Sequence, residues 1–189
     1  MPMGCGRALV LPRELRLQGS ELQLHPIPET GVLRTGHAVR CSGDDSRLAA
    51  GSQVEIQLRC SWVAATTPPS RGRSGIRTLA SADSAHYVEL GYDWQAQCFY
   101  ADHTKCCGAS SSTPIVQRAP LPLAMLGPVL NLTLYVDGGV LEAFLAGRVI
   151  TPLVAPDIAA GGPPEARVSS IVNTAPGVSC SAESWKLAY

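Results

Sequence analysis

The nine residues Val54–Trp62 read VEIQLRCSW and alternate strictly between apolar and polar side chains. Successive side chains of a β-strand point to opposite faces of a sheet, so this pattern predicts a strand with one dry face and one wetter face. The residues expected on the dry face are Val54, Ile56, Leu58, Cys60 and Trp62. Such a strand is typical of a β-sandwich, in which two sheets bury their facing sides against each other.

Other segments of similar character follow along the chain. The further strands that we expect are Leu9–Leu11, Glu21–His25, His86–Tyr92, Gln97–Asp102, Val129–Asp137, Val140–Leu145, Arg148–Thr151, Ala166–Asn173 and Ser184–Tyr189. Clusters of glycine and proline, which a sheet interior does not accept, separate them at Thr67–Gly75, Gly108–Pro122 and Ala155–Pro164. Ser46–Ala50 allows one helical turn at most. About ten short strands without alternating helices predict an all-β, antiparallel two-sheet β-sandwich of the jelly-roll or lectin-like kind.

The composition is that of one globular domain. A chain of 189 residues with 46% hydrophobic and 16% charged residues can build a real core. Basic and acidic residues balance at 15 each and are scattered, which gives no electrostatic footprint for nucleic acid or an anionic membrane. No apolar run is long enough to span a bilayer, and residues 1–7 lack the apolar core of a signal peptide. As written, the chain is expected in the cytoplasm.

Seven cysteines are present, an odd number that cannot all pair within one chain. Their spacing fits no zinc template, because the only close set is the adjacent pair Cys106-Cys107. Three interpretations stay open. The cysteines are small buried residues with some free thiols, they form one or two disulfides in an exported parent protein, or they serve metal or redox chemistry.

The segment Asn131–Ala146 is predicted to be a β-hairpin with Gly138-Gly139 as its two-residue loop. Both central residues of a type I′ turn need positive φ, which glycine adopts readily. In this register one face of the hairpin is entirely apolar and is expected on the core side. It consists of Leu132, Leu134, Val136, Leu141, Ala143 and Leu145.

The opposite face of this hairpin carries Asp137 and Glu142, and paired carboxylates are the usual machinery of glycoside hydrolysis. Diagonal neighbours on a hairpin lie ~7–8 Å apart at the backbone, within the roughly 5–9 Å at which catalytic carboxyls flank a sugar bond. A hairpin tip is convex, however, whereas catalytic carboxylates need a recessed and partly dry site. We therefore interpret Asp137, Gly138, Gly139 and Glu142 as a structural hairpin.

Other residues are candidates for binding. Tyr92, Trp94 and Tyr100 are the candidate sugar contacts, because aromatic faces pack on sugar C–H surfaces; packing within the fold is the alternative. The triplet Asn131-Leu132-Thr133 fits the N-glycosylation sequon, which matters only if the parent protein enters the secretory path.

The histidines give weaker signals. Asp102-His103 resembles half of a catalytic dyad, but no Gly-x-Ser-x-Gly elbow accompanies it, so we interpret it as a turn. His25, His37 and His86 have no partners at metal-binding spacing.

Five segments occur in a recognisable order: LPREL (Leu11–Leu15), VELGYD (Val88–Asp93), FYADHTK (Phe99–Lys105), LTLYVDGGVLEAFLAGRVIT (Leu132–Thr151) and WKL (Trp185–Leu187). Together they resemble the C-terminal half of glycoside hydrolase family 32, the invertases, inulinases, levanases and fructan-processing enzymes. In that family the Pro-Arg-Glu-Leu segment lies where a five-bladed catalytic propeller passes into a C-terminal β-sandwich. The resemblance implies that residues 1–20 are a joint from a missing propeller and that residues 21–189 form one sandwich domain.

The catalytic acids of the family lie in Asn-Asp-Pro, Arg-Asp-Pro and Glu-Cys motifs, and this chain contains none of them. Glu14 and Glu142 match family positions that are structural. The resemblance therefore implies no catalytic, metal or cofactor-binding residue in this chain, and a parent enzyme that cleaves β-fructosidic bonds without a cofactor. Such parents are often secreted or vacuolar, so the location stays unknown.

The sequence thus predicts an accessory, non-catalytic sandwich of an enzyme acting on sucrose or fructans. The expected partner is the catalytic propeller, with sucrose or fructan and a second copy of the chain as further candidates, and with neither nucleic acid nor a membrane. The alternative is a free-standing, lectin-like fructan-binding module, and hydrolysis by this chain alone is a third hypothesis. If the module packs against a propeller, apolar residues of Ala8–Pro26 should lie exposed when the chain is alone.

Overall fold

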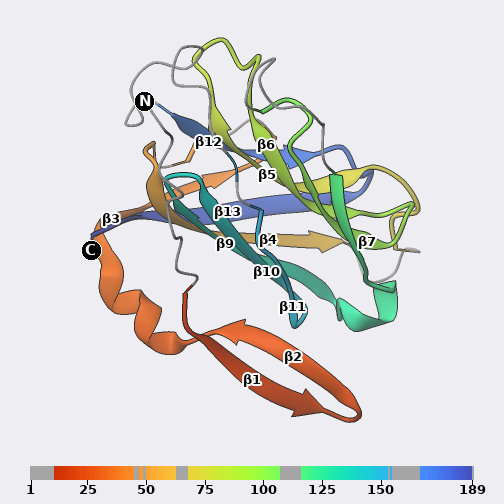
Figure 1. The fold of residues 1–189 in the computed structure, drawn as a ribbon. Helices are drawn as coiled ribbons and strands as arrows, with labels where there is room; N and C mark the ends of the chain where they lie inside the picture. Colours follow the sequence, from red (N-terminus) through yellow and green to blue (C-terminus); the bar gives the residue numbers. More distant parts are fainter. Residues whose placement is uncertain are drawn as a thin grey trace, which may run out of the picture.

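Two larger antiparallel sheets pack face to face, and a two-stranded hairpin projects beyond them (Figure 1). The computed structural model describes residues 11–44, 47–48, 50–62, 68–106, 116–152, 154 and 167–188. Within these residues the expected all-β sandwich is confirmed.

The strands fall into three groups. The six-stranded sheet has the order β11 (Arg148–Ile150), β10 (Val140–Leu145), β9 (Val129–Asp137), β4 (Gln53–Trp62), β13 (Val178–Leu187) and β3 (Arg34–Ser42). The five-stranded sheet has the order β12 (Val168–Asn173), β5 (Arg73–Ala80), β6 (Val88–Asp93), β7 (Cys98–Asp102) and β8 (Val116–Pro120). The hairpin consists of β1 (Arg13–Gln18) and β2 (Glu21–Pro26), and the short 3-10 helices are η1 (Pro28–Leu33) and η3 (Leu123–Met125).

β4 lies in the interior of the six-stranded sheet, between β9 and β13. Its apolar face enters the core between the two larger sheets, as the alternation predicts. On the opposite face Arg59 and Ser61 are exposed, but Glu55 is completely buried. The wetter face is therefore covered at one end of the strand, and the covering segment builds the site described below.

The β9–β10 hairpin has the predicted register, since Asp137 pairs with Val140 and leaves Gly138-Gly139 as the loop. All six side chains of its apolar face are buried in the core. The turn differs from the expectation, because only Gly138 has positive φ (58°). Positive φ at the first central residue alone is the requirement of a type II′ turn rather than of type I′.

Several strands lie outside the predicted set. The sequence patterns missed β3, and β13 begins at Val178 rather than at Ser184. β1 begins at Arg13, so the strand expected at Leu9–Leu11 is wrong at Leu11, and its first two residues lie outside the described part. Arg47 forms a β-bridge with Ser170.

Two expected breaks contain strand residues. Residues 73–75 belong to β5, where Gly75 pairs with Gly91, and an added Cβ on Gly75 would lie 2.2 Å from the Leu90 carbonyl oxygen. Glycine at these two positions therefore allows the two backbones to approach closely, and it does not break the strand. β8 lies within the second expected break and tolerates Pro120 because it is an edge strand. The third expected break, residues 155–164, lies outside the described residues.

A disulfide joins Cys60 on β4 to Cys180 on β13, two residues that pair directly across the strands. Of the three interpretations of the cysteines, disulfide formation therefore applies to Cys60 and Cys180. Cys98 is a buried free thiol. Among the helices of the described residues, none is long and apolar enough to cross a membrane.

Candidate functional site

Three side chains stand in one row across the outer face of the six-stranded sheet. Glu55 on β4 pairs with Tyr135 on β9, which pairs with Glu142 on β10, so the three side chains point to the same face. All three are buried, because the segment of residues 11–34, which ends at the first residue of β3, covers them. We call Glu55, Tyr135 and Glu142 the anchor row, since each binds a residue of that segment.

Glu142 binds the segment at its beginning. The backbone N–H of Leu11 donates to Oε2, Nε of Arg13 donates to Oε1 at 3.2 Å, and Nη2 of Arg13 also binds Oε1. Nη2 donates as well to Oγ1 of Thr151 at 2.9 Å. The guanidinium carbon lies 6.0 Å from the ring centre of Phe144. Both oxygens of Glu142 are thus occupied by the Leu-Pro-Arg end of the segment.

Glu55 binds the segment at its other end. Arg34 donates two parallel hydrogen bonds to its carboxylate, from Nε at 2.8 Å and from Nη2 at 2.6 Å. Gln57 donates a third at 2.8 Å, and the Arg34 guanidinium lies 4.0 Å above the ring of Trp185. The hydrogen bond to Glu55 raises the pKa of Arg34, so this fully buried carboxylate has a permanent partner.

Tyr135 lies between the two acids and binds the middle of the segment. Its hydroxyl is 2.9 Å from Oγ1 of Thr30 in η1. Burial raises the pKa of Tyr135 to about 12, which keeps the phenol neutral. A small apolar cluster surrounds the ring, and Leu11 and Leu33 from the segment pack against it. The anchor row therefore fixes both ends and the middle of residues 11–34 on the sandwich.

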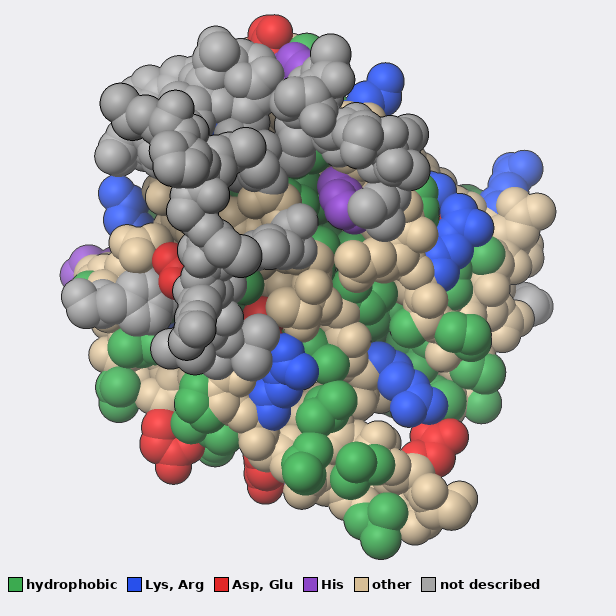
Figure 2. Space-filling model, in the orientation of Figure 1, with side chains coloured by type: hydrophobic (Ala, Val, Ile, Leu, Met, Phe, Trp, Pro, Cys, Tyr) green, Lys and Arg blue, Asp and Glu red, His purple; other side chains and the backbone are tan. Residues whose placement is uncertain are grey.

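The hairpin held by this row carries its apolar side chains outward. In its register Leu15 pairs with Leu24 and Leu17 with Leu22, which places these four on one face. Leu15, Leu17 and Leu22 are 61%, 75% and 56% exposed. We call these four residues the leucine face, and Figure 2 shows hydrophobic side chains gathered at the end of the molecule where the hairpin projects. The expectation of exposed apolar residues before residue 26 is confirmed.

The other face of the hairpin is polar and lies toward the sandwich. The side chain of Gln23 packs against Gly147, and Arg16 and His25 line a hollow together with Phe144. The usual amphipathic order is thus reversed, with polar groups toward the chain's own domain and leucines toward solvent.

The two acids considered for catalysis lie in different surroundings. Asp137 is exposed, and its carboxylate accepts a hydrogen bond from Gln53 at 3.2 Å. Glu142 is covered by the N-terminal segment and bound by Arg13. No described cavity contains both carboxylates, a geometry that fits the structural interpretation of the hairpin.

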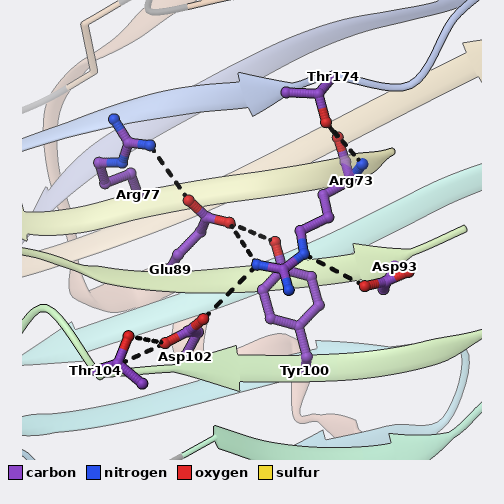
Figure 3. A network of polar contacts seen from close by, with 8 residues as sticks. All are labelled: Arg73, Arg77, Glu89, Asp93, Tyr100, Asp102, Thr104 and Thr174. Carbon is purple, nitrogen blue, oxygen red and sulfur yellow. Dashed lines mark hydrogen bonds and ion pairs between the residues drawn. The ribbon is translucent and has the colours of Figure 1, made fainter. Parts of the chain in front are cut away.

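A second polar network lies on the outer face of the five-stranded sheet (Figure 3). Arg73 lies 4.7 Å above the ring of Tyr100 and contacts Asp93 at 3.3 Å, Glu89 at 3.6 Å and Asp102 at 3.7 Å. The hydroxyl of Tyr100 donates to Glu89 at 2.8 Å. Burial and the charge of Glu89 raise the pKa of Tyr100 well above its ordinary value. Because Arg73 on β5 contacts Glu89 and Asp93 on β6 and Asp102 on β7, the network ties the three strands together.

The candidate sugar-binding aromatics have no open ring face. Tyr92 and Trp94 lie in the core, and Tyr100 lies beneath Arg73. The hydroxyl of Tyr92 donates to the Leu121 carbonyl and the indole of Trp94 donates to Ser74, each at 2.9 Å. The two sheets close around Tyr92 and Trp94, and Arg73 covers Tyr100, so none of these three rings presents an open face to a sugar.

No group of three or more possible metal ligands occurs in the described parts of the chain. Asp102 accepts hydrogen bonds from the N–H and hydroxyl of Thr104, the geometry of a turn. The sequence patterns missed Arg34 and Glu55, which lie in unrelated segments. The remaining signal was weak: Glu55 is an acid near the start of a strand, between the apolar residues Val54 and Ile56.

The chain belongs to the C-terminal domain family of glycoside hydrolase family 32. The family described as "Glycosyl hydrolases family 32 C terminal" matches residues 28–185, which is most of the sequence. No match appears among curated proteins.

Solved structures of similar fold include the exo-inulinase of Aspergillus awamori, with 22% identity, a TM-score of 0.71, and coverage of 95% of this chain and 35% of that one. Fructan 1-exohydrolase IIa of Cichorium intybus has 17% identity and a TM-score of 0.71, with coverage of 94% and 40%. A family 32 β-fructofuranosidase of Bombyx mori has 16% identity and a TM-score of 0.65, with coverage of 94% and 32%. This chain thus spans 32–40% of the length of these three chains.

Proposed function

We propose that this chain is the accessory sandwich of an enzyme that hydrolyses sucrose or fructans, and that its leucine face packs against the catalytic domain of that enzyme. The observation that carries the proposal is the direction of the leucine face. An isolated domain gains nothing from turning leucines to solvent while its polar side chains face its own surface. A second domain beside the hairpin would bury them.

The anchor row supports this role because it fixes the position of the hairpin. The Arg13–Glu142 and Arg34–Glu55 ion pairs hold the segment on both sides of the hairpin. A docking surface held in one orientation loses less conformational entropy on binding than a mobile one. The sandwich would contribute rigidity and orientation, and the chemistry would reside in the other domain.

The first test is the transcript. We expect a reading frame that continues upstream of Met1 into a domain with the Asn-Asp-Pro, Arg-Asp-Pro and Glu-Cys motifs. A transcript that provides no such domain would contradict the proposal.

The second test is binding between this chain and the separately expressed catalytic domain, measured by calorimetry. Burying a whole leucine contributes about 1.5–3 kcal/mol, so Leu17→Lys should weaken binding roughly tenfold or more. Gln18→Lys is the matched control, because it adds the same charge to the opposite face of β1. Equal effects of the two substitutions would exclude the leucine face as the contact.

The lectin-like alternative is tested with the same chain. Titration with sucrose, inulin and levan should show no saturable binding, and saturable binding by the isolated chain would support the alternative. Incubation with the same sugars should release no fructose; release that disappears in Glu142→Gln would support independent hydrolysis. A homodimer stays a prediction that sedimentation of the chain can test.

A further inference from the structure

The outer face of the six-stranded sheet remains open beyond the anchor row. Ser181 on β13, Arg59 on β4 and Asn131 on β9 are neighbours in the register, and all three are exposed. Within the described residues, no hydrogen bond or ion pair engages these three side chains. The side-chain amide of Asn131 is therefore uncommitted on a solvent-facing surface.

Asn131 also lies at the point where its neighbouring strand ends. The last pair between β9 and β10 joins Leu132 to Leu145, so Asn131 has no partner on β10. The chain turns away there through Ala146 and Gly147, whose φ angles are 47° and 74°. On the side of β10, therefore, no paired strand residue restricts the side chain of Asn131.

Two hollows flank this position and share Asn131 and Thr133 in their walls. One of about 270 Å³ extends over Arg59 and Ser181, and the other, of about 380 Å³, extends toward Phe144. A bulky group attached at Asn131 would therefore find space on both sides without displacing a strand.

We propose that Asn131 is an N-glycosylation acceptor. Asn131-Leu132-Thr133 is a sequon, and residues two apart on a strand share a face, so Asn131 and Thr133 lie together. In the transfer, the amide nitrogen bonds to the anomeric carbon of a lipid-diphosphate-linked oligosaccharide and loses a proton. The lipid diphosphate leaves as the bond to that carbon breaks.

An independent observation supports the compartment that this modification requires. The Cys60–Cys180 disulfide is of the kind that forms and persists in oxidising compartments such as the lumen of the endoplasmic reticulum. Asn173 provides an internal contrast, because Thr174-Ala175 follows it and completes no sequon. Its amide donates to the Val178 carbonyl at 2.8 Å. The inference does not depend on the partner domain proposed above.

The test uses the full chain behind a secretion signal in a eukaryotic host, with intact mass measured before and after treatment with a peptide-N-glycosidase. We expect added mass that the enzyme removes, leaving Asn131 converted to aspartate. Asn131→Gln and Thr133→Ala should lose the added mass, and Thr133→Ser, which preserves the sequon, should keep it. If Asn131→Gln does not fold, the comparison of Thr133→Ala with Thr133→Ser decides the outcome. Secreted wild-type chain with the Cys60–Cys180 disulfide formed and no added mass would overturn the proposal.

Discussion

Replacing Glu142 with glutamine removes the charge of the anchor row where it binds the start of the N-terminal segment. Glu142 is 2% exposed and accepts hydrogen bonds from the Leu11 N–H and from two nitrogens of Arg13. A glutamine amide retains one acceptor oxygen, and its NH₂ group must face one of these donors. At least one former partner of Glu142 therefore loses its hydrogen bond.

The magnitude follows from the burial of the two partners. Breaking a buried ion pair by removing one partner costs about 3–5 kcal/mol. The side chain of Arg13 is 23% exposed, so water partly solvates the charge that remains. We therefore expect Glu142→Gln to lower the free energy of unfolding by about 2–3 kcal/mol. In a chain of this size the melting temperature should fall by roughly 5–10 °C.

Urea unfolding followed by tryptophan fluorescence measures this loss, with Asp137→Asn as the control. Asp137 is exposed and has one hydrogen bond, from Gln53, so its change should stay within about 0.5 kcal/mol. In a double-mutant cycle with Arg13→Met, the double variant should lose less than the sum of the single losses. Equal stability of Glu142→Gln and Asp137→Asn, or strict additivity with Arg13→Met, would refute the reasoning.

Three further predictions concern the rest of the fold. Replacing both Cys60 and Cys180 with alanine should lower the free energy of unfolding by about 4 kcal/mol, because the disulfide closes a loop with a sequence separation of 120 residues; a thermal melt that matches the oxidised wild type would contradict this. Gly138→Ala should lower the free energy of unfolding by about 1 kcal/mol, because Gly138 has a φ of 58°. Gly139→Ala should lower it by less. The reverse order in urea titrations would show that the turn type is assigned wrongly. Burial raises the pKa of Tyr135 to about 12 in the folded chain, so its stabilising contribution is complete below pH 10 and is lost as the pH rises toward 12; because the chain has five tyrosines, the measurement is the difference in tyrosinate absorbance between the wild type and Tyr135→Phe, and a difference that develops near pH 10 would exclude this.

Local patterns were sufficient for the elements whose sequence alternates. The strand at Val54–Trp62 and the hairpin with its loop at Gly138-Gly139 depend on residue types two apart, and the structure has both. β3 was missed because its sequence, RTGHAVRCS, has no continuous apolar face. It is a strand because it pairs with β13 at the edge of the sheet, a long-range cause that a local pattern does not contain.

The anchor row was beyond the reach of local patterns for the same reason. Glu142 was recognised as structural from the hairpin and the family resemblance, but its partner Arg13 lies 129 residues away. Glu55 was expected on a wetter face because it alternates with apolar residues, and Arg34 reverses that expectation by covering it. Tyr100 was a candidate sugar contact because it is an aromatic residue on a predicted strand. Arg73 lies above its ring, so Tyr100 belongs to the polar network of the five-stranded sheet instead.

The central claim is that the leucine face of the β1–β2 hairpin meets the catalytic domain of the parent enzyme. Hydrogen exchange of this chain, measured with and without that domain, tests it most directly. The account predicts slower exchange at residues 13–26 and unchanged exchange at residues 57–59 and 129–133 on the open outer face. Slower exchange on that outer face, with the hairpin unchanged, would contradict it.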